Sequence, residues 1–201
     1  MRNIFISLFL LISFNVSAQN DEERWVDSVF NSLTLEQRVG QLFNLRANDP
    51  NKDFNTYIDD YIERYNIGGV TFFRTDAEKL LTKANEWQAK SQTPMMIAID
   101  GEWGIGMRIN DGISYPYQMT LGAVTNDSLI AEMGRQIAEQ CTRIGINVNF
   151  APTVDVNNEP NNPVIGFRSF GENADNVARK GLAYAMALQD NGVLPSMKHF
   201  P

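Results

Sequence analysis

Charged and titratable side chains occur at points where the sequence predicts that β-strands end. Asp100 follows the apolar run 95–99, Arg74 follows Phe73, and Lys198 and His199 end a last strand that begins near Val193. Arg168 lies in a predicted loop from Ala151 to Asn173, and loops that long in a compact domain are usually functional. A carboxylate accepts two donors at once, Arg presents a rigid fork and Lys a point charge. These side chains could therefore accept and donate hydrogen bonds to a polar ligand.

The elements that must position these residues alternate between helix and strand. Helical spacing or capping residues predict helices over 35–43, 54–65, 75–87, 126–144 and 173–188, several of them ended by Gly or Asn-Gly. Short apolar runs predict strands over 70–73, 95–99, 148–150 and 193–198. Alternating strands and helices predict an α/β fold whose parallel strands are covered on both faces.

Both a doubly wound sheet and a (β/α)8 barrel fit this alternation. The segment 101–106 is rich in glycine, but it lacks the dinucleotide-binding spacing, comes late and precedes no clear helix. We therefore predict a TIM-type (β/α)8 barrel, whose working side chains lie at the carboxyl ends of the strands. A whole barrel takes roughly 250 residues. The 201 residues end directly after a strand, so we expect an incomplete barrel, its N-terminal portion only.

The first 18 residues have the pattern of a secretory signal peptide. Arg2 supplies a positive charge, residues 4–14 are apolar apart from two serines, and Val16-Ser17-Ala18 offers small residues for cleavage. The run is too short to span a bilayer, although a buried helix is the alternative. No cysteine follows it, so a lipid anchor is not expected. We predict a signal peptide over 1–18, a partial barrel domain over 19–201, and export to the periplasm or the exterior without stable membrane insertion.

Composition excludes several classes of function. The chain is 43% apolar and 20% charged with a net charge of −7, which is typical of a globular protein and gives no electrostatic footprint for nucleic acid. Its one cysteine, Cys141, lies on the apolar face of a predicted helix and is expected to be a buried structural thiol. With one Cys and one His a zinc site is not expected, and no other metal or cofactor is implied.

Each candidate residue also has an ordinary structural interpretation. Asp100 could form a turn with Gly101, Arg168 could be a solvated loop charge, and His199 could be a core histidine. Trp103 and Tyr117 could stack on a sugar, although packing is the more common role of aromatic residues. Asp155 could orient the loop at 157–158 instead of contacting a ligand. The functional interpretation therefore depends on the pattern as a whole.

That pattern resembles glycoside hydrolase family 3, in its β-N-acetylhexosaminidase branch, from about Leu33 to the end. The segment 99–104 resembles the family's Asp-Gln-Glu-Gly-Gly motif, and Arg108 matches the arginine that follows it. Further matches are Tyr115-Pro116, 121–123, 145–147 and 151–156, and the sharpest are Asn162-Pro163-Val164-Ile165-Gly166-Phe167-Arg168-Ser169-Phe170-Gly171 and Lys198-His199-Phe200-Pro201. The sequence departs from the family at Gly101 and at Trp103, which leaves the substrate preference open.

The resemblance implies a role for each matched residue. Asp100 would accept hydrogen bonds from the hydroxyls of a bound sugar, and Arg108, Arg168, Lys198 and His199 would donate to them. The partner is then a carbohydrate that contains N-acetylglucosamine, cleaved at a terminal β-glycoside with retention. Holding the ring in this way favours its distortion toward the oxocarbenium-like transition state.

The resemblance also implies that the catalytic groups are absent from these residues. In this branch the nucleophile is an aspartate late in the barrel, and the acid/base is a His–Asp pair beyond Lys-His-Phe-Pro. We therefore expect no catalytic residue before Pro201 and no glycosidase activity from these 201 residues alone. The alternatives are a β-glucosidase or β-xylosidase of the same family, or a degenerate barrel that binds sugar without catalysis.

Overall fold

The computed structural model describes residues 20–48 and 54–199, so the predicted signal peptide lies outside the described residues. The chain divides into two compact units, the first ending at Thr34 and the second beginning at Leu35. The first contains helix α1, Asp21–Ser32, whose N-cap Asn20 forms a capping box with Glu23. This helix was not predicted. Among the described residues, no helix is long and apolar enough to cross a membrane.

The second unit is built on a five-stranded sheet. Its strands, in chain order and in spatial order, are β1 Asn44–Arg46, β2 Gly69–Phe72, β3 Met96–Ile99, β4 Val148–Asn149 and β5 Leu194–Pro195. Every neighbouring pair is parallel. A doubly wound sheet reverses its strand order at a switch point, whereas a barrel adds each strand beside the previous one. The observed order is therefore that of a barrel wall.

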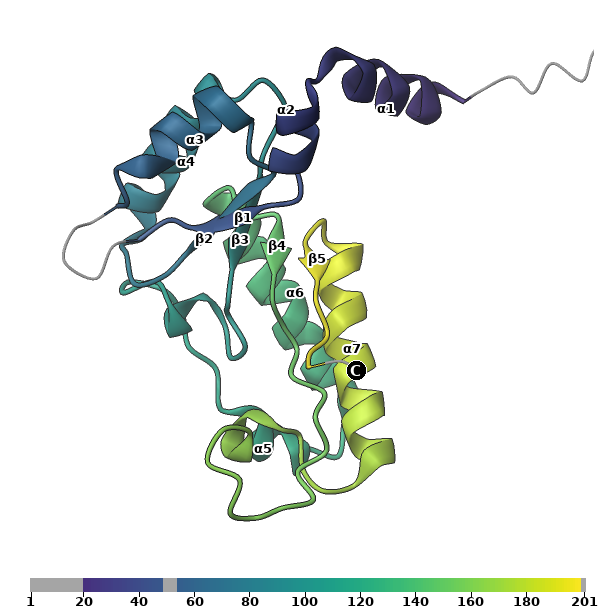
Figure 1. Ribbon diagram of the computed structural model, residues 1–201. Coiled ribbons are helices and arrows are strands. Elements are labelled where there is room, and N and C mark those ends of the chain that lie inside the picture. Colours follow the sequence, from purple (N-terminus) through teal and green to yellow (C-terminus); the bar gives the residue numbers. More distant parts are fainter. Residues whose placement is uncertain (1–19, 49–53, 200–201) are drawn as a thin grey trace, which may run out of the picture. The chain divides into compact units, whose positions relative to one another are not determined.

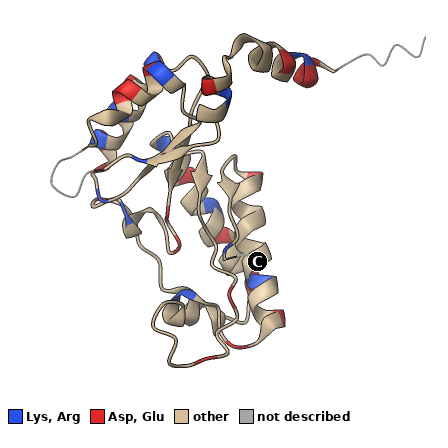
Figure 2. Cartoon of the chain, viewed as in Figure 1, with Lys and Arg blue, Asp and Glu red and all other residues tan. Residues whose placement is uncertain are grey.

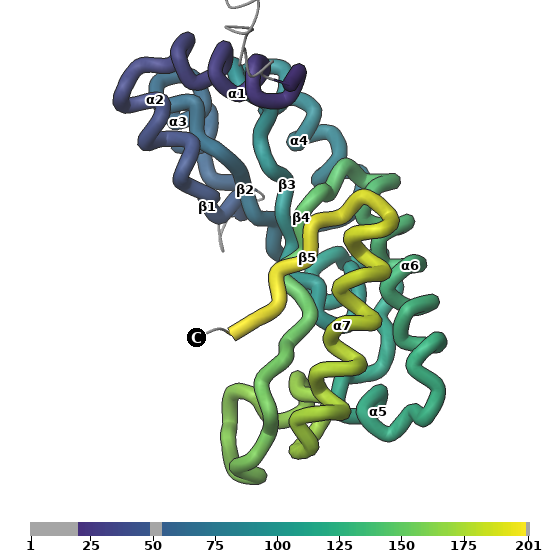
Figure 3. The backbone as a smooth tube through the Cα atoms, turned by 90° about the vertical axis from the view of Figure 1, so that its right-hand side faces the viewer, coloured from purple at the N-terminus to yellow at the C-terminus, as the bar shows by residue number. Residues whose placement is uncertain are grey.

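Helices connect and cover these strands (Figure 1). They are α2 Leu35–Gly40, α3 Tyr57–Tyr65, α4 Ala77–Lys90, α5 Gln118–Gly122, α6 Asp127–Arg143 and α7 Ala174–Asp190, with short 3-10 turns η1 Ile105–Met107 and η2 Gly166–Arg168. The two long helices α6 and α7 lie side by side, and α7 packs against β5 (Figure 3). Acidic and basic side chains are interspersed along α3 and α4 (Figure 2), as on other solvated helices.

The core lies between the sheet and the helices. Its largest fully buried side chains include Trp87 of α4, Tyr184 of α7, Phe72 of β2 and Phe170. Cys141 is also fully buried, and burial raises the pKa of its thiol to about 12. The structure therefore confirms the prediction of a structural thiol.

Three local predictions were wrong. The helix predicted over 35–43 ends at Gly40, because residues 44–46 pair with β2 and form a strand that the sequence did not reveal. The helix predicted to begin at Thr75 begins at Ala77 instead, with Asp76 at its N-cap. The Asp76 side chain makes no capping bond, and the Ala77 N–H donates to the side chain of Asp111. The last strand ends at Pro195, although Lys198 pairs once more with Thr153.

Candidate functional site

Hydrogen bonds from β4 and α7 fix the backbone of the segment that follows β3. Asn149 of β4 bonds both backbone groups of Gly101, at 2.9 Å to its nitrogen and 3.2 Å to its oxygen. The hydroxyl of Tyr184 donates to the same oxygen at 3.2 Å. Asp100 and Glu102 therefore leave the sheet in fixed directions, at the carboxyl ends of the strands where barrel enzymes place their working groups.

Asp100 lies between two cations. Arg108 donates through Nη2 to one carboxylate oxygen and through Nε to the backbone oxygen of Asp100 at 3.1 Å, and Lys198 donates to the other carboxylate oxygen. Burial raises the pKa of Asp100, but the hydrogen bonds from Lys198 and Arg108 outweigh it and bring the pKa below its usual value. Asp100 is thus an anion with a free lone pair on each oxygen.

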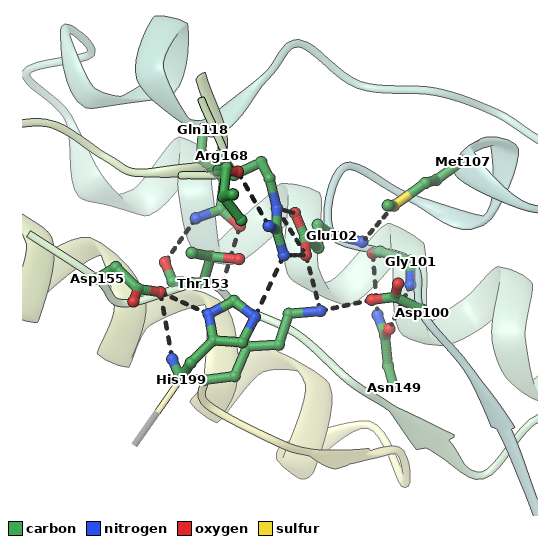
Figure 4. A network of polar contacts seen from close by, with 12 residues as sticks. Asp100, Gly101, Glu102, Met107, Gln118, Asn149, Thr153, Asp155, Arg168 and His199 are labelled. Carbon is green, nitrogen blue, oxygen red and sulfur yellow. Dashed lines mark hydrogen bonds and ion pairs between the residues drawn. The ribbon is translucent and has the colours of Figure 1, made fainter. Parts of the chain in front are cut away.

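Glu102 extends the network beneath the surface (Figure 4). Its side chain is fully buried, and it accepts from Lys198 at 2.7 Å and from Arg168 at 2.6 and 2.9 Å. Burial raises the pKa of Glu102, and the bonds from Arg168 and Lys198 bring it below the ordinary value. Burial of an unpaired carboxylate would cost several kcal/mol, so the two cations make the burial of Glu102 possible. Sequence reasoning missed this role, although an acid two residues after Asp100 was a visible signal.

His199 completes the cluster at its outer edge. Its Nδ1 lies 2.8 Å from Asp155, whose carboxylate also accepts from the His199 backbone N–H at 3.2 Å. Its Nε2 lies 3.2 Å from Nη2 of Arg168. Because a guanidinium can only donate, these partners assign the proton to Nδ1. With the proton on Nδ1, Nε2 is an acceptor, so donation from Nε2 to a sugar would need a second proton on the ring as well as loss of the Arg168 contact. Asp155 therefore orients His199 and not the loop at 157–158.

The five residues predicted from the sequence thus come together. Asp100, Arg108, Arg168, Lys198 and His199 are joined by hydrogen bonds and ion pairs, with Glu102 bridging Arg168 and Lys198 and with Asp155 bound to His199. Arg74, the other residue at a strand end, has an exposed side chain and takes no part in the network. Its backbone is left-handed, with φ of 35°.

A hollow of about 350 Å³ opens beside the network. It is lined by Asn44, Arg46, Thr71, Phe73, Asp100, Phe150 and Lys198. The guanidiniums of Arg46 and Arg108 lie over the Phe73 ring, 5.0 and 4.8 Å from its centroid. Small-molecule sites measure about 300–1,000 Å³, so the hollow suits one small ligand. Among the described residues, no group of three or more His, Cys, Asp or Glu could hold a metal ion.

A parallel barrel wall with a cluster of donors and acceptors at its carboxyl end is the arrangement that barrel proteins use to bind a polar ligand. The chain belongs to a particular family: residues 34–201 match the glycosyl hydrolase family 3 N-terminal domain. It is 42% identical over 157 residues to β-hexosaminidase A of Pseudoalteromonas piscicida, a match that covers 72% of this chain and 26% of that relative.

Solved structures agree on the fold. A family 3 β-N-acetylglucosaminidase from Paenibacillus sp. str. FPU-7 superposes with a TM-score of 0.76 at 36% identity, over 84% of this chain and 33% of that one. A β-glucoside phosphorylase bound to 2FGlc gives a TM-score of 0.82 at 25% identity, over 90% of this chain and 33% of that one. These likenesses confirm the predicted family and the barrel fold. The chain spans about a quarter to a third of the length of these relatives.

Proposed function

We propose that the protein that carries this chain is a β-N-acetylhexosaminidase, which removes terminal N-acetylglucosamine from β-glycosides with retention. The convergence of Asp100, Arg108, Arg168, Lys198 and His199 on one edge of the sheet supports this proposal. So does the family membership, with relatives named β-hexosaminidase and β-N-acetylglucosaminidase. The chain itself supplies substrate binding.

The donors left over after the internal bonds decide what the site can bind. Lys198 has three N–H groups, of which Asp100 and Glu102 take two. Arg168 has five, of which Glu102, His199 and the carbonyl of Val164 take four. One donor on each residue, together with the open lone pairs of Asp100, remains for sugar hydroxyls. Such a fixed set positions the ring so that its anomeric carbon faces the catalytic groups supplied by the rest of the protein.

Hydrolysis of two nitrophenyl glycosides tests the proposal. The protein that carries this chain should cleave the N-acetylglucosaminide much faster than the glucoside, and residues 1–201 alone should cleave neither. Preference for the glucoside would instead establish a β-glucosidase. Absence of hydrolysis, with retained binding of N-acetylglucosamine, would establish a sugar-binding barrel.

Export of the protein is a separate part of the proposal. The pattern of residues 1–18 supports cleavage after Ala18. Expression in a bacterium and N-terminal sequencing of the periplasmic or secreted product should find Gln19 as the first residue. An intact N-terminus in the cytoplasm would contradict it.

A further inference from the structure

Three aromatic rings from separate loops meet beside the charged network. Trp103 follows β3, Tyr117 precedes α5, and Phe167 lies in η2. The Trp103 and Tyr117 rings are 4.8 Å apart in a T-shaped arrangement, and the Tyr117 and Phe167 rings are stacked 6.1 Å apart at 26°. We call these three residues the aromatic surface. It arises in part from Trp103, where the family motif resembled by this segment has glycine.

The aromatic surface is open to solvent. Phe167 is 72% exposed and Tyr117 is 48% exposed. Phe170, only three residues further along the same loop, is 1% exposed and fills the core. The fold can therefore bury a phenyl ring from this loop, yet it leaves Phe167 outside. Large apolar side chains grouped on a surface are typical of a binding site.

Two of the rings adjoin residues of the network in sequence, and the third is linked to the network through its neighbour. Trp103 is next to Glu102, and Phe167 is next to Arg168, so the Glu102–Arg168 ion pair joins the two segments that carry these rings. Tyr117 is next to Gln118, which donates to the Thr153 carbonyl at 2.7 Å, and Thr153 pairs with Lys198. Because neighbouring Cα atoms are about 3.8 Å apart, the aromatic surface adjoins the network that would hold the terminal sugar.

The chemistry of the aromatic surface differs from that of the network. A pyranose ring has hydroxyls around its rim and C–H groups on its faces, and aromatic rings bind such apolar faces by stacking. The nearest charges, Glu102 and Arg168, are already paired with one another, so the surface offers no free ion for a charged ligand. It therefore suits the face of an uncharged sugar, whereas the network suits the rim.

We infer that the aromatic surface is a second saccharide subsite, which stacks the sugar that follows the terminal N-acetylglucosamine on the leaving-group side. This inference rests on the proposed function. It predicts that a second sugar adds to binding, and that a glycoside with a small leaving group lacks this contribution because it cannot reach the aromatic surface.

Two substrates separate this subsite from the site for the terminal sugar. N,N′-diacetylchitobiose has a second ring, and N-acetylglucosaminyl fluoride has none. In the protein that carries this chain, Phe167→Ala and Tyr117→Ala should each lower kcat/KM for the disaccharide roughly tenfold, which corresponds to about 1.4 kcal/mol. The value for the fluoride should stay within about twofold, since contacts to the terminal sugar are untouched.

Phe43→Ala is the matched control, because Phe43 is 54% exposed but lies before β1, at the opposite end of the strands. Phe43→Ala should leave kcat/KM unchanged for both substrates. Equal losses for disaccharide and fluoride in Phe167→Ala, or unchanged kcat/KM for both, would overturn the subsite. If the unaltered protein cleaves neither substrate, the proposed function fails instead.

Binding supplies a readout independent of turnover. Chitobiose should quench the tryptophan fluorescence of the protein more strongly than N-acetylglucosamine does, and Trp103→Phe should abolish the difference. Trp87 is fully buried and serves as the internal reference. An identical response to both sugars would count against stacking on the aromatic surface.

Discussion

The guanidinium of Arg168 binds the carboxylate of Glu102 through two nitrogens, Nε at 2.9 Å and Nη2 at 2.6 Å, across 66 residues of sequence. The Glu102 side chain is fully buried, and Arg168 is one-quarter exposed. This fork joins the loop between β4 and α7 to the end of β3. It also fixes where the remaining N–H of Arg168 can point, so the proposed sugar site depends on an acid that is itself fully buried.

Glu102→Gln should destabilise the fold while preserving its shape. The substitution leaves Arg168 without its anionic partner and Lys198 with only one. Loss of one member of a buried pair costs about 3–5 kcal/mol, and because the cations are partly exposed we expect on the order of 2–3 kcal/mol. Urea unfolding, monitored by circular dichroism, measures this loss of unfolding free energy. The control is Glu132→Gln, which removes an exposed ion pair with Arg135 on α6 and should change the unfolding midpoint far less. A similar change in both variants would contradict a special role for Glu102.

The same residues predict a loss of stability in acid. The folded-state pKa values of Asp100 and Glu102 lie below their ordinary values of 3.8 and 4.5. Their contribution is therefore fully present above the ordinary values and is lost as the pH falls through the lower, folded ones. The difference in unfolding free energy between the unaltered protein and Glu102→Gln should be constant near neutrality and shrink below about pH 4. Unfolding curves from pH 3 to 7 test this prediction, and a difference in unfolding free energy that grows in acid would contradict it.

Asp100→Asn should abolish most of the activity in the protein that carries this chain. Asparagine keeps the shape but offers one acceptor oxygen, so either Lys198 or Arg108 loses its bond to this side chain, and a bound sugar would lose an acceptor. A loss near 3 kcal/mol for unpaired charged groups corresponds to about a hundredfold fall in kcat/KM. Asp111→Asn, at an exposed acid that bonds Ala77, is the matched control and should retain activity. Full activity in Asp100→Asn would remove Asp100 from the site.

Arg168→Lys should show that geometry, and not charge alone, is needed in this loop. Lysine cannot make the two-nitrogen contact with Glu102 or reach His199 and Val164 at the same time. We expect KM to rise about tenfold, in line with the loss of one well-placed charged hydrogen bond. Steady-state kinetics beside Arg135→Lys, an exposed arginine of α6, provide the comparison. An unaltered KM would mean that a point charge suffices.

Cys141 should be inert in the folded protein. Its side chain is fully buried and its pKa of about 12 leaves almost no thiolate at neutral pH. Ellman's reagent should release no more than a trace of thionitrobenzoate until denaturant is added, and then one equivalent for the single cysteine. Rapid labelling without denaturant would show that α6 opens locally.

The sequence by itself determined the alternation of strands and helices and favoured the barrel class, and its resemblance to family 3 indicated the residues that come together at the candidate site. Residues such as Ile99 and Asp100 carry this information locally, because a buried strand must be apolar and the first polar residue after it marks its carboxyl end. The helix starts at 126 and 173 were also predicted from local residues, and the side chains of Asn126 and Asn173 each accept a backbone N–H there.

Only the tertiary structure decided the strand at 44–46, the burial of Glu102 and the partners of His199. A three-residue strand has too few side chains for a period, so its pairing with β2 sets its conformation. The sequence places Glu102 two residues after Asp100 but does not show its burial, which is tolerable only because Arg168 and Lys198 come from distant parts of the chain. Ion pairing and ring stacking join residues that are neighbours in space alone, which is why no local pattern contained them.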